Sequence, residues 1–89
     1  MFFDFDNFNF VDHTLTYGNY GGFNYSAGML GGTITETSPD PVDPLDALFF
    51  QHDFVYQTST DPAALREADV DLVEGVVNLA HNAILDWLV

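Results

Sequence analysis

The chain contains no cysteine and only one Lys or Arg among its 89 residues. Without cysteine it can form neither a disulfide nor a thiolate zinc site. Its length predicts one domain, residues 1–89, with a small hydrophobic core. Small domains usually gain stability from disulfides, a bound metal or a partner subunit. We therefore expect a metal ion or self-association to support this fold.

Positive charge is nearly absent, whereas Asp and Glu number 14, so the formal net charge is −13. Nucleic-acid binding needs Lys and Arg to neutralise phosphates, and electrostatic docking on anionic lipid needs the same residues. The composition thus excludes nucleic acid as a partner, disfavours anionic membranes and favours cations.

Long apolar segments are also missing. No stretch reaches the roughly 18 uncharged apolar residues of a membrane-spanning helix. The N-terminus shows no basic region followed by an apolar run, so no signal peptide is visible. The chain is nevertheless 47% hydrophobic and 16% aromatic, whereas disordered acidic chains are poor in aromatic residues. The composition therefore predicts a folded domain.

The first half of the chain has no helical pattern. Phe alternates with Asp and Asn in residues 1–12, MFFDFDNFNFVD, which predicts an extended segment. This segment is either an edge strand or arm that covers the core, or an exposed aromatic surface for lipid or a partner. Residues 17–32 are rich in Gly, Asn and Tyr and predict a loop with several positive φ angles. Residues 33–42 extend this connection, and connections this long are usually functional or disordered.

The second half predicts two helices. Asp43 is a suitable N-cap followed by a proline, and apolar residues then recur at steps of three and four to about Gln57. A polar break follows, and either Thr60 or Asp61 caps a second helix that runs toward the C-terminus. Gly75 is a potential weak point of that helix. The result is an antiparallel helix pair joined by a short turn.

Counting across this pair brings polar residues together. If the turn centres near residue 60 or 61, His52 on the first helix lies opposite about Asp69 on the second; Asp71 faces elsewhere. A carboxylate opposite an imidazole accepts one ring N–H and leaves the other nitrogen as a base. Tyr56 shares a helix face with His52, so its hydroxyl can reach Asp69. Asp53 points about 100° around the helix, where it can bind a cation brought in by the Gly-rich loop.

Three segments resemble the secretory phospholipase A2 family: YGNYGG at residues 17–22, PVDPLDALFFQHDFVY at residues 41–56, and Ala-Asp at residues 68–69. In that family a Tyr-Gly-x-Tyr-x-Gly loop binds calcium, and His-Asp-x-x-Tyr lies on the active-site helix. The Ala-Asp segment is especially similar to the cysteine-free domain of parvovirus capsid proteins. The resemblance covers about residues 17–75. It implies a mainly α fold in which two antiparallel helices carry the active site, preceded by a Gly-rich calcium loop and an extended N-terminal aromatic arm.

The resemblance implies an activity and its catalytic residues. The activity is hydrolysis of the sn-2 ester of glycerophospholipids at a membrane surface, in a secreted or virion-associated protein. His52 is the base that takes a proton from the attacking water. Asp69 orients His52, and Tyr56 donates a hydrogen bond to Asp69. The N–H group of Gly22 helps to stabilise the oxyanion.

The same resemblance implies Ca²⁺ as the cofactor. Asp53 supplies the carboxylate ligand, and the main-chain oxygens of Tyr20, Gly22 and Asn24 supply the loop ligands. Asn24 and Tyr25 stand where the family usually has glycine, which weakens calcium binding unless Asn24 adopts the required backbone angles. Asn tolerates positive φ better than most residues.

The chain departs from the family at its half-cystine positions, which hold Asn19, Gly21, Leu48, Phe49 and Val55. The three apolar replacements can restore packing, since each contributes about 1.5–3 kcal/mol when fully buried. No room remains for the family's β-wing.

Other readings stay open at this point. The chain is alternatively a calcium- or partner-binding module of the same fold with little turnover, or an acidic interaction protein without site chemistry. His52 is then a core histidine. His13 and His81 have no motif around them, so we expect both to be structural. The apolar stripe of the last helix predicts core packing or contact with a second copy rather than membrane binding; it comprises Val76, Val77, Leu79, Ala80, Ala83, Ile84, Trp87 and Leu88.

Overall fold

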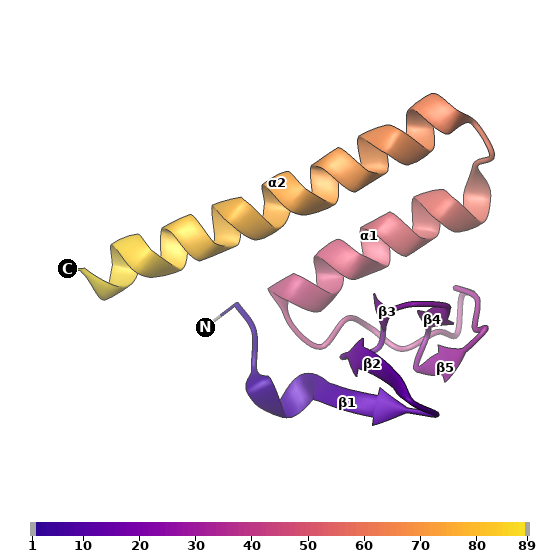
Figure 1. Ribbon diagram of the computed structural model, residues 1–89, viewed down its shortest axis with the longest axis horizontal. Coiled ribbons are helices and arrows are strands. Elements are labelled where there is room, and N and C mark those ends of the chain that lie inside the picture. The colour runs from indigo at the N-terminus through magenta and orange to yellow at the C-terminus, as the bar shows by residue number, and fades with distance from the viewer. Residues whose placement is uncertain (1, 89) are drawn as a thin grey trace.

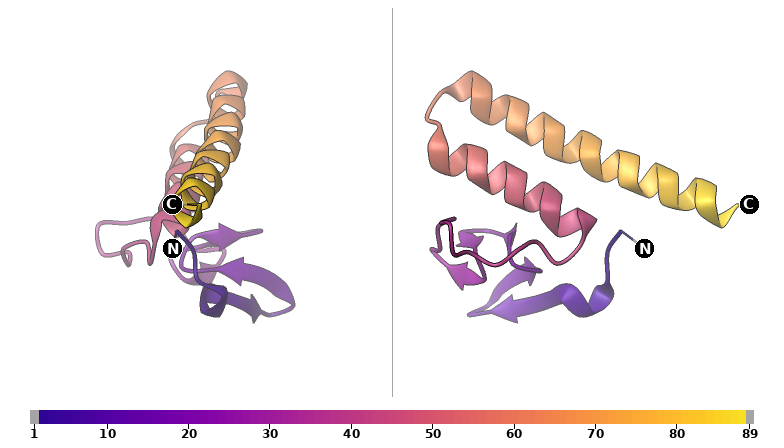
Figure 2. Two further views of the ribbon diagram at one scale, coloured as in Figure 1. Left: turned by 90° about the vertical axis from the view of Figure 1, so that its left-hand side faces the viewer. Right: turned by 180° about the vertical axis from the view of Figure 1, so that it is seen from behind.

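The computed structural model describes residues 2–88, which form two long helices and two small antiparallel sheets (Figure 1). The helices are α1 (Pro44–Thr58) and α2 (Pro62–Trp87). A single 3₁₀ turn, Phe5–Asn7, precedes the strands. The strands are β1 (Phe8–Val11), β2 (Thr14–Tyr17), β3 (Gly21–Gly22), β4 (Tyr25–Ser26) and β5 (Met29–Leu30). Seen from the front and from behind, α1 lies between α2 and the strands (Figures 1 and 2).

The helices begin where the capping residues predict. The Asp43 side chain accepts a hydrogen bond from the backbone N–H of Asp46 at the start of α1. Asp61, rather than Thr60, caps α2 through the N–H of Ala63. Gly75, the potential weak point, does not interrupt α2, which continues through it. Gly75 instead lets the helices approach closely: a Cβ atom there would lie 2.7 Å from the side chain of Leu48.

The fold is only partly the mainly α architecture that the sequence suggested. Strands β1, β2 and β3 form one sheet in that order, and β4 pairs with β5. The N-terminal segment is therefore a 3₁₀ turn and a β-hairpin rather than a plain extended arm. The predicted 17–32 loop likewise contains three short strands. The alternation in residues 1–12 correctly predicted the first strand. It did not predict that this strand pairs with residues 14–17.

The β1–β2 turn consists of two residues with positive φ, Asp12 at 48° and His13 at 68°. Two-residue hairpins of this kind favour Asn-Gly or Asp-Gly, because glycine adopts positive φ without steric cost. We expect His13→Gly to raise the free energy of unfolding by about 1 kcal/mol. Urea denaturation followed by circular dichroism measures this change. A lower urea midpoint for His13→Gly would contradict the turn assignment.

The most buried side chains lie where the three-stranded sheet meets the start of α1. Tyr20 and Asp46 are fully buried, and Tyr17 is 3% exposed. Aromatic rings link the sheet to the helix, with the Tyr17 ring 4.8 Å from Phe8 and 6.1 Å from Phe49. Phe49 thus packs at a position that is half-cystine in the resembled family, and a side chain at Gly21 would collide with its ring.

Hydrogen bonds fasten the N-terminal segment to α1. The carboxylate of Asp43, besides capping the helix, accepts hydrogen bonds from the Tyr17 hydroxyl and the Asn7 side chain. The backbone N–H of Leu45 donates to the carbonyl oxygen of Phe2. The N-terminal strands are therefore an integral part of the domain. Between residues 2 and 88, neither helix is long and apolar enough to cross a membrane.

Candidate active site

His52 and Asp69 meet across the two helices. The distance from His52 Nε2 to Asp69 Oδ1 is 2.7 Å, and the Tyr56 hydroxyl donates to the same oxygen at 2.7 Å. Tyr56 follows His52 by one helical turn on α1, so both side chains reach α2 from one face. The structure therefore brings together the three residues that counting across the hairpin placed side by side. Asp71, two residues further along α2, makes no such contact with the imidazole.

The carboxylate of Asp69 determines which nitrogen of His52 is free. A carboxylate only accepts hydrogen bonds, so Nε2 carries the proton and Nδ1 keeps its lone pair. The hydrogen bonds from His52 and then Tyr56 lower the pKa of Asp69. The hydrogen bond to Asp69 is also the main cause that raises the pKa of Tyr56. Asp69 thus stays ionised and keeps His52 in the tautomer that a general base requires.

Asp53 lies on the opposite side of the imidazole. Its Oδ1 is 4.0 Å from His52 Nδ1, and its side chain is 22% exposed. Asp53 Oδ2 and the hydroxyl oxygen of Ser26 are both buried without a hydrogen-bond partner. Burial raises the pKa of Asp53 from 3.8 to about 6, against the smaller opposing effects of the nearby Ser26 hydroxyl, which is not in hydrogen-bond geometry, and of His52. The carboxylate is therefore poorly compensated by the protein itself.

These residues open on one broad cavity of about 660 Å³ between α1 and the short strands. His52, Asp53 and Tyr56 line it from α1, and Leu72 closes it from α2. The loop contributes residues that include Tyr20, Gly22, Phe23, Asn24, Tyr25 and Ser26. The candidate catalytic residues and the candidate calcium ligands thus face the same cavity, except for Asp69, which lies behind His52.

Asp46 joins the loop to α1. Its Oδ1 accepts a hydrogen bond from Tyr20 N–H at 2.9 Å, and its Oδ2 accepts from the N–H groups of Asn19 and Val42, each at 3.0 Å. At Gly18, with φ of 55°, a Cβ atom would lie 2.5 Å from the Asp46 carboxyl carbon. The sequence analysis gave Asp46 no such role. The one feature of the sequence that could have indicated this role of Asp46 is the Asp-x-x-Asp spacing that begins with Asp43.

The loop adopts the backbone conformations that its composition suggested. Gly22 has φ of 142° and Asn24 has φ of 50°. Asn24 therefore does take a positive φ, at a position where the resembled family usually has glycine. Its carbonyl oxygen accepts a hydrogen bond from Gly31 N–H at 2.7 Å, which engages one of the two lone pairs.

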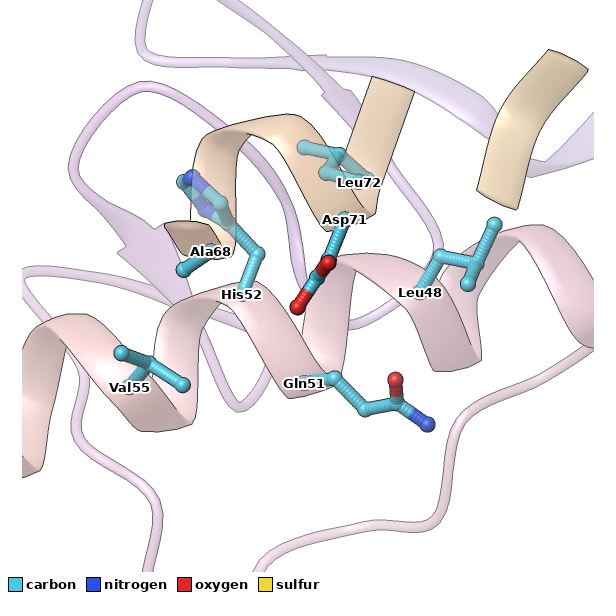
Figure 3. A pocket seen from close by; sticks show the side chains of 7 residues that line it. All are labelled: Leu48, Gln51, His52, Val55, Ala68, Asp71 and Leu72. Carbon is cyan, nitrogen blue, oxygen red and sulfur yellow. The ribbon is translucent and has the colours of Figure 1, made fainter. Parts of the chain in front are cut away.

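A second, smaller hollow of about 130 Å³ lies between the helices (Figure 3). Its walls include His52 and Asp71, and also Leu48 and Val55, which stand at half-cystine positions of the resembled family. Leu48 and Val55 thus pack between the helices, as expected, but do not fill the space completely. His52 separates this hollow from the larger cavity.

Substitution of Asp53 tests its poor solvation. The folded-state pKa of Asp53, about 6, exceeds its ordinary value of 3.8, which applies to the unfolded chain. Folding therefore disfavours the charged form of Asp53. This penalty is absent below the unfolded pKa, grows as pH rises, and is complete above the folded pKa. Without divalent cations, we expect Asp53→Asn to raise the free energy of unfolding at neutral pH by about 1–3 kcal/mol and to have little effect at about pH 3.5.

Urea titrations at both pH values measure this difference. Asp71→Asn, an exposed substitution of the same chemistry, is the matched control. An equal effect of Asp53→Asn at both pH values would contradict the burial of an uncompensated charge.

Within residues 2–88, no three His, Asp or Glu side chains come close enough to form a metal site by themselves. A cation at Asp53 would depend on backbone oxygens of the loop, which hard cations accept as ligands. In comparisons with known proteins, no protein-family model, curated protein or solved structure matches this chain.

Proposed function

We propose that the chain is a calcium-dependent hydrolase that cleaves the sn-2 ester of glycerophospholipids, as the resemblance to secretory phospholipase A2 implies. The observation that carries the proposal is the orientation of His52. Its Nε2 is held by Asp69, whereas its Nδ1 lies toward the partly buried carboxylate of Asp53 beside the cavity. A base and a cation-binding carboxylate on one side of a cavity are what hydrolysis by an activated water needs.

His52 would act as the general base. A water at the free Nδ1 would lose a proton to the imidazole as its oxygen attacks the ester carbonyl. The positive charge that develops on the imidazole ring would be stabilised by Asp69, to which Tyr56 donates. The proton on His52 would then pass to the leaving alcohol of the lysophospholipid. This mechanism leaves no covalent intermediate on the chain.

The residues around Asp53 fit a calcium ion. Asp53 Oδ2 is buried and unpaired, so a cation would supply the compensation that the protein lacks. The backbone oxygens of Tyr20, Gly22 and Asn24 are the proposed loop ligands. When bound, Ca²⁺ would neutralise negative charge on the substrate phosphate and on the developing oxyanion. The N–H group of Gly22 would donate to the same oxyanion.

An apolar row beside the cavity supports a lipid substrate. Phe10 of β1 pairs with Leu15 of β2, and their side chains are 71% and 54% exposed. The pairing of Thr16 with Gly22, continued by one residue, places Phe23 beside Leu15. Phe23 is 87% exposed and lines the cavity. With a net charge of −13, this surface suits zwitterionic rather than anionic phospholipid.

The alternative is a calcium- or partner-binding module of the same fold with little turnover. The hydrogen bond from Gly31 N–H to the carbonyl oxygen of Asn24 favours this alternative, because it occupies one lone pair of an oxygen that is proposed to bind Ca²⁺. The side chain of Asp69 is also 55% exposed, so water competes for the oxygen that orients His52.

An assay of fatty-acid release decides between the two functions. Phosphatidylcholine vesicles are incubated with the chain in the presence of Ca²⁺ or of a chelator, and the released acid and lysophospholipid are identified. We expect release from the sn-2 position that stops when Ca²⁺ is removed. Calorimetric binding of Ca²⁺ without any release would identify the binding module. If the chain neither binds Ca²⁺ nor releases fatty acid, both functions are refuted.

A further inference from the structure

Helix α2 carries two apolar faces. One faces α1: Ala68 and Leu72 lie against Leu48 and His52, and Gly75 lies against Leu48. The other is a row of residues at alternating steps of three and four, which we call the outer seam; it comprises Val70, Val73, Val77, Ala80, Ile84 and Trp87. At 100° per residue the outer seam is centred roughly 140° around the helix from the first face.

The structure leaves the outer seam uncovered. Val73, Val77 and Trp87 are 63%, 60% and 83% exposed, respectively. Because α1 lies between α2 and the strands (Figure 2), no other described element packs on the far side of α2. The sequence interpretation combined the two faces into one stripe, which the structure separates.

The spacing of the outer seam indicates another helix as its occupant. Apolar residues that alternate at three and four residues repeat every seven, which is the pattern of helices packed side by side as a coiled coil. The row runs over residues 70–87, about 26 Å of helix. A flat lipid surface needs a broad apolar face with cationic flanks, whereas acidic Glu67 and Glu74 border this row.

Charge selects the direction of packing. In a parallel pair, Glu74 of one copy would lie near Asp69 of the other across the edge of the seam, and the helix dipoles would be aligned unfavourably. In an antiparallel pair that places Val77 opposite Ala80, Glu74 lies within one helical turn of His81 of the other copy. The same register places Val73 opposite Ile84 and Val70 opposite Trp87.

We propose that a second copy of this chain packs antiparallel on the outer seam, forming a dimer in which α2 of each copy covers α2 of the other. Val70 adjoins Asp69, so Trp87 of the second copy lies next to the exposed Asp69 carboxylate. The dimer thereby shields the hydrogen bonds that Asp69 makes with His52 and Tyr56 from water. This last consequence depends on the proposed function, whereas the dimer itself does not.

Sedimentation equilibrium of the full chain tests the dimer. We expect a concentration-dependent dimer for the unsubstituted chain, and self-association about ten-fold or more weaker for Val77→Glu, because the dimer would bury an unpaired charge. Asn78→Glu is the matched control, since it adds the same charge at the next residue, outside the outer seam. Circular dichroism shows whether both variants keep their helices. An unsubstituted chain that stays monomeric at high micromolar concentration, or equal effects of the two substitutions, would overturn the proposal.

The absence of cysteine allows a test of direction. In an antiparallel pair, a mixture of Val73→Cys and Ile84→Cys chains forms a disulfide-linked heterodimer on oxidation, whereas each variant alone cross-links poorly. Efficient cross-linking of each variant alone would show parallel packing and refute the register. If Val77→Glu instead weakened binding to phosphatidylcholine vesicles more than Asn78→Glu and the chain stayed monomeric, lipid would be the occupant.

If fatty-acid release is observed, we expect Val77→Glu to lower it more than Asn78→Glu at concentrations where only the latter is dimeric. If no release is observed with any chain, the proposed function fails, and sedimentation still decides the dimer.

Discussion

Replacement of His52 by Gln is expected to abolish calcium-dependent fatty-acid release, with a loss of about 10²–10⁴-fold or more. Gln is close to His in size and can still donate a hydrogen bond to Asp69, but it has no basic nitrogen with which to take a proton from water. The His52 side chain is only 25% exposed, and Gln preserves most of its packing. The fold and calcium affinity should therefore change little while turnover disappears.

His13→Gln is the control for this substitution. His13 is exposed in the β1–β2 turn, outside the candidate active site and the proposed dimer contact, so the same chemical change there should leave release unaltered. Initial rates on phosphatidylcholine vesicles, with circular dichroism of each variant, measure both effects. Release that survives His52→Gln would show that another group activates the water, and the proposed mechanism would be wrong.

Replacement of Asp46 by Asn is expected to cause the largest loss of stability. Three backbone N–H groups donate to its two oxygens, and the side chain is fully buried. Asn offers one acceptor oxygen and places an NH₂ group where a second acceptor was needed. A buried N–H group left unpaired costs about 1–3 kcal/mol, so we expect a loss of about 3 kcal/mol or more. That is a large share of the stability of a small domain.

Urea denaturation measures this loss, and Asp71→Asn on the exposed face of α2 is the control. Since Asp46 holds the N–H groups of Asn19 and Tyr20, calcium affinity should fall as well, although Asp46 does not face the proposed cation. Calorimetry on any Asp46→Asn chain that remains folded separates loop disorder from global unfolding. Unchanged stability in Asp46→Asn would contradict the role of this carboxylate as the anchor of the loop.

The helical half of the fold was predictable because its signals are local. An aspartate before a proline caps each helix, and the apolar period identifies the helical segments. The turn position then sets which residues of the two helices face each other. His52 and Asp69 could for this reason be paired by counting, and the structure places them 2.7 Å apart.

The strands could not be predicted in the same way. β3, β4 and β5 are two residues each, too short to show a period. Their pairing depends on contacts with β2 and with each other, and two-residue segments become strands only when such partners are present. The glycine content of residues 17–32 indicated the positive φ angles correctly but not the turns and ladders that they make possible.

By itself, the sequence determined the two helices and their caps, the opposition of His52 and Asp69, and the lack of disulfides and of basic binding surfaces. These properties depend on composition or on spacing along one element or one hairpin. Only the tertiary structure decided that Asp46 is the buried anchor of the loop, that Asp53 is poorly solvated, and that α2 keeps an uncovered apolar seam. Burial depends on which segments distant in the chain surround a side chain, and local spacing carries no such information.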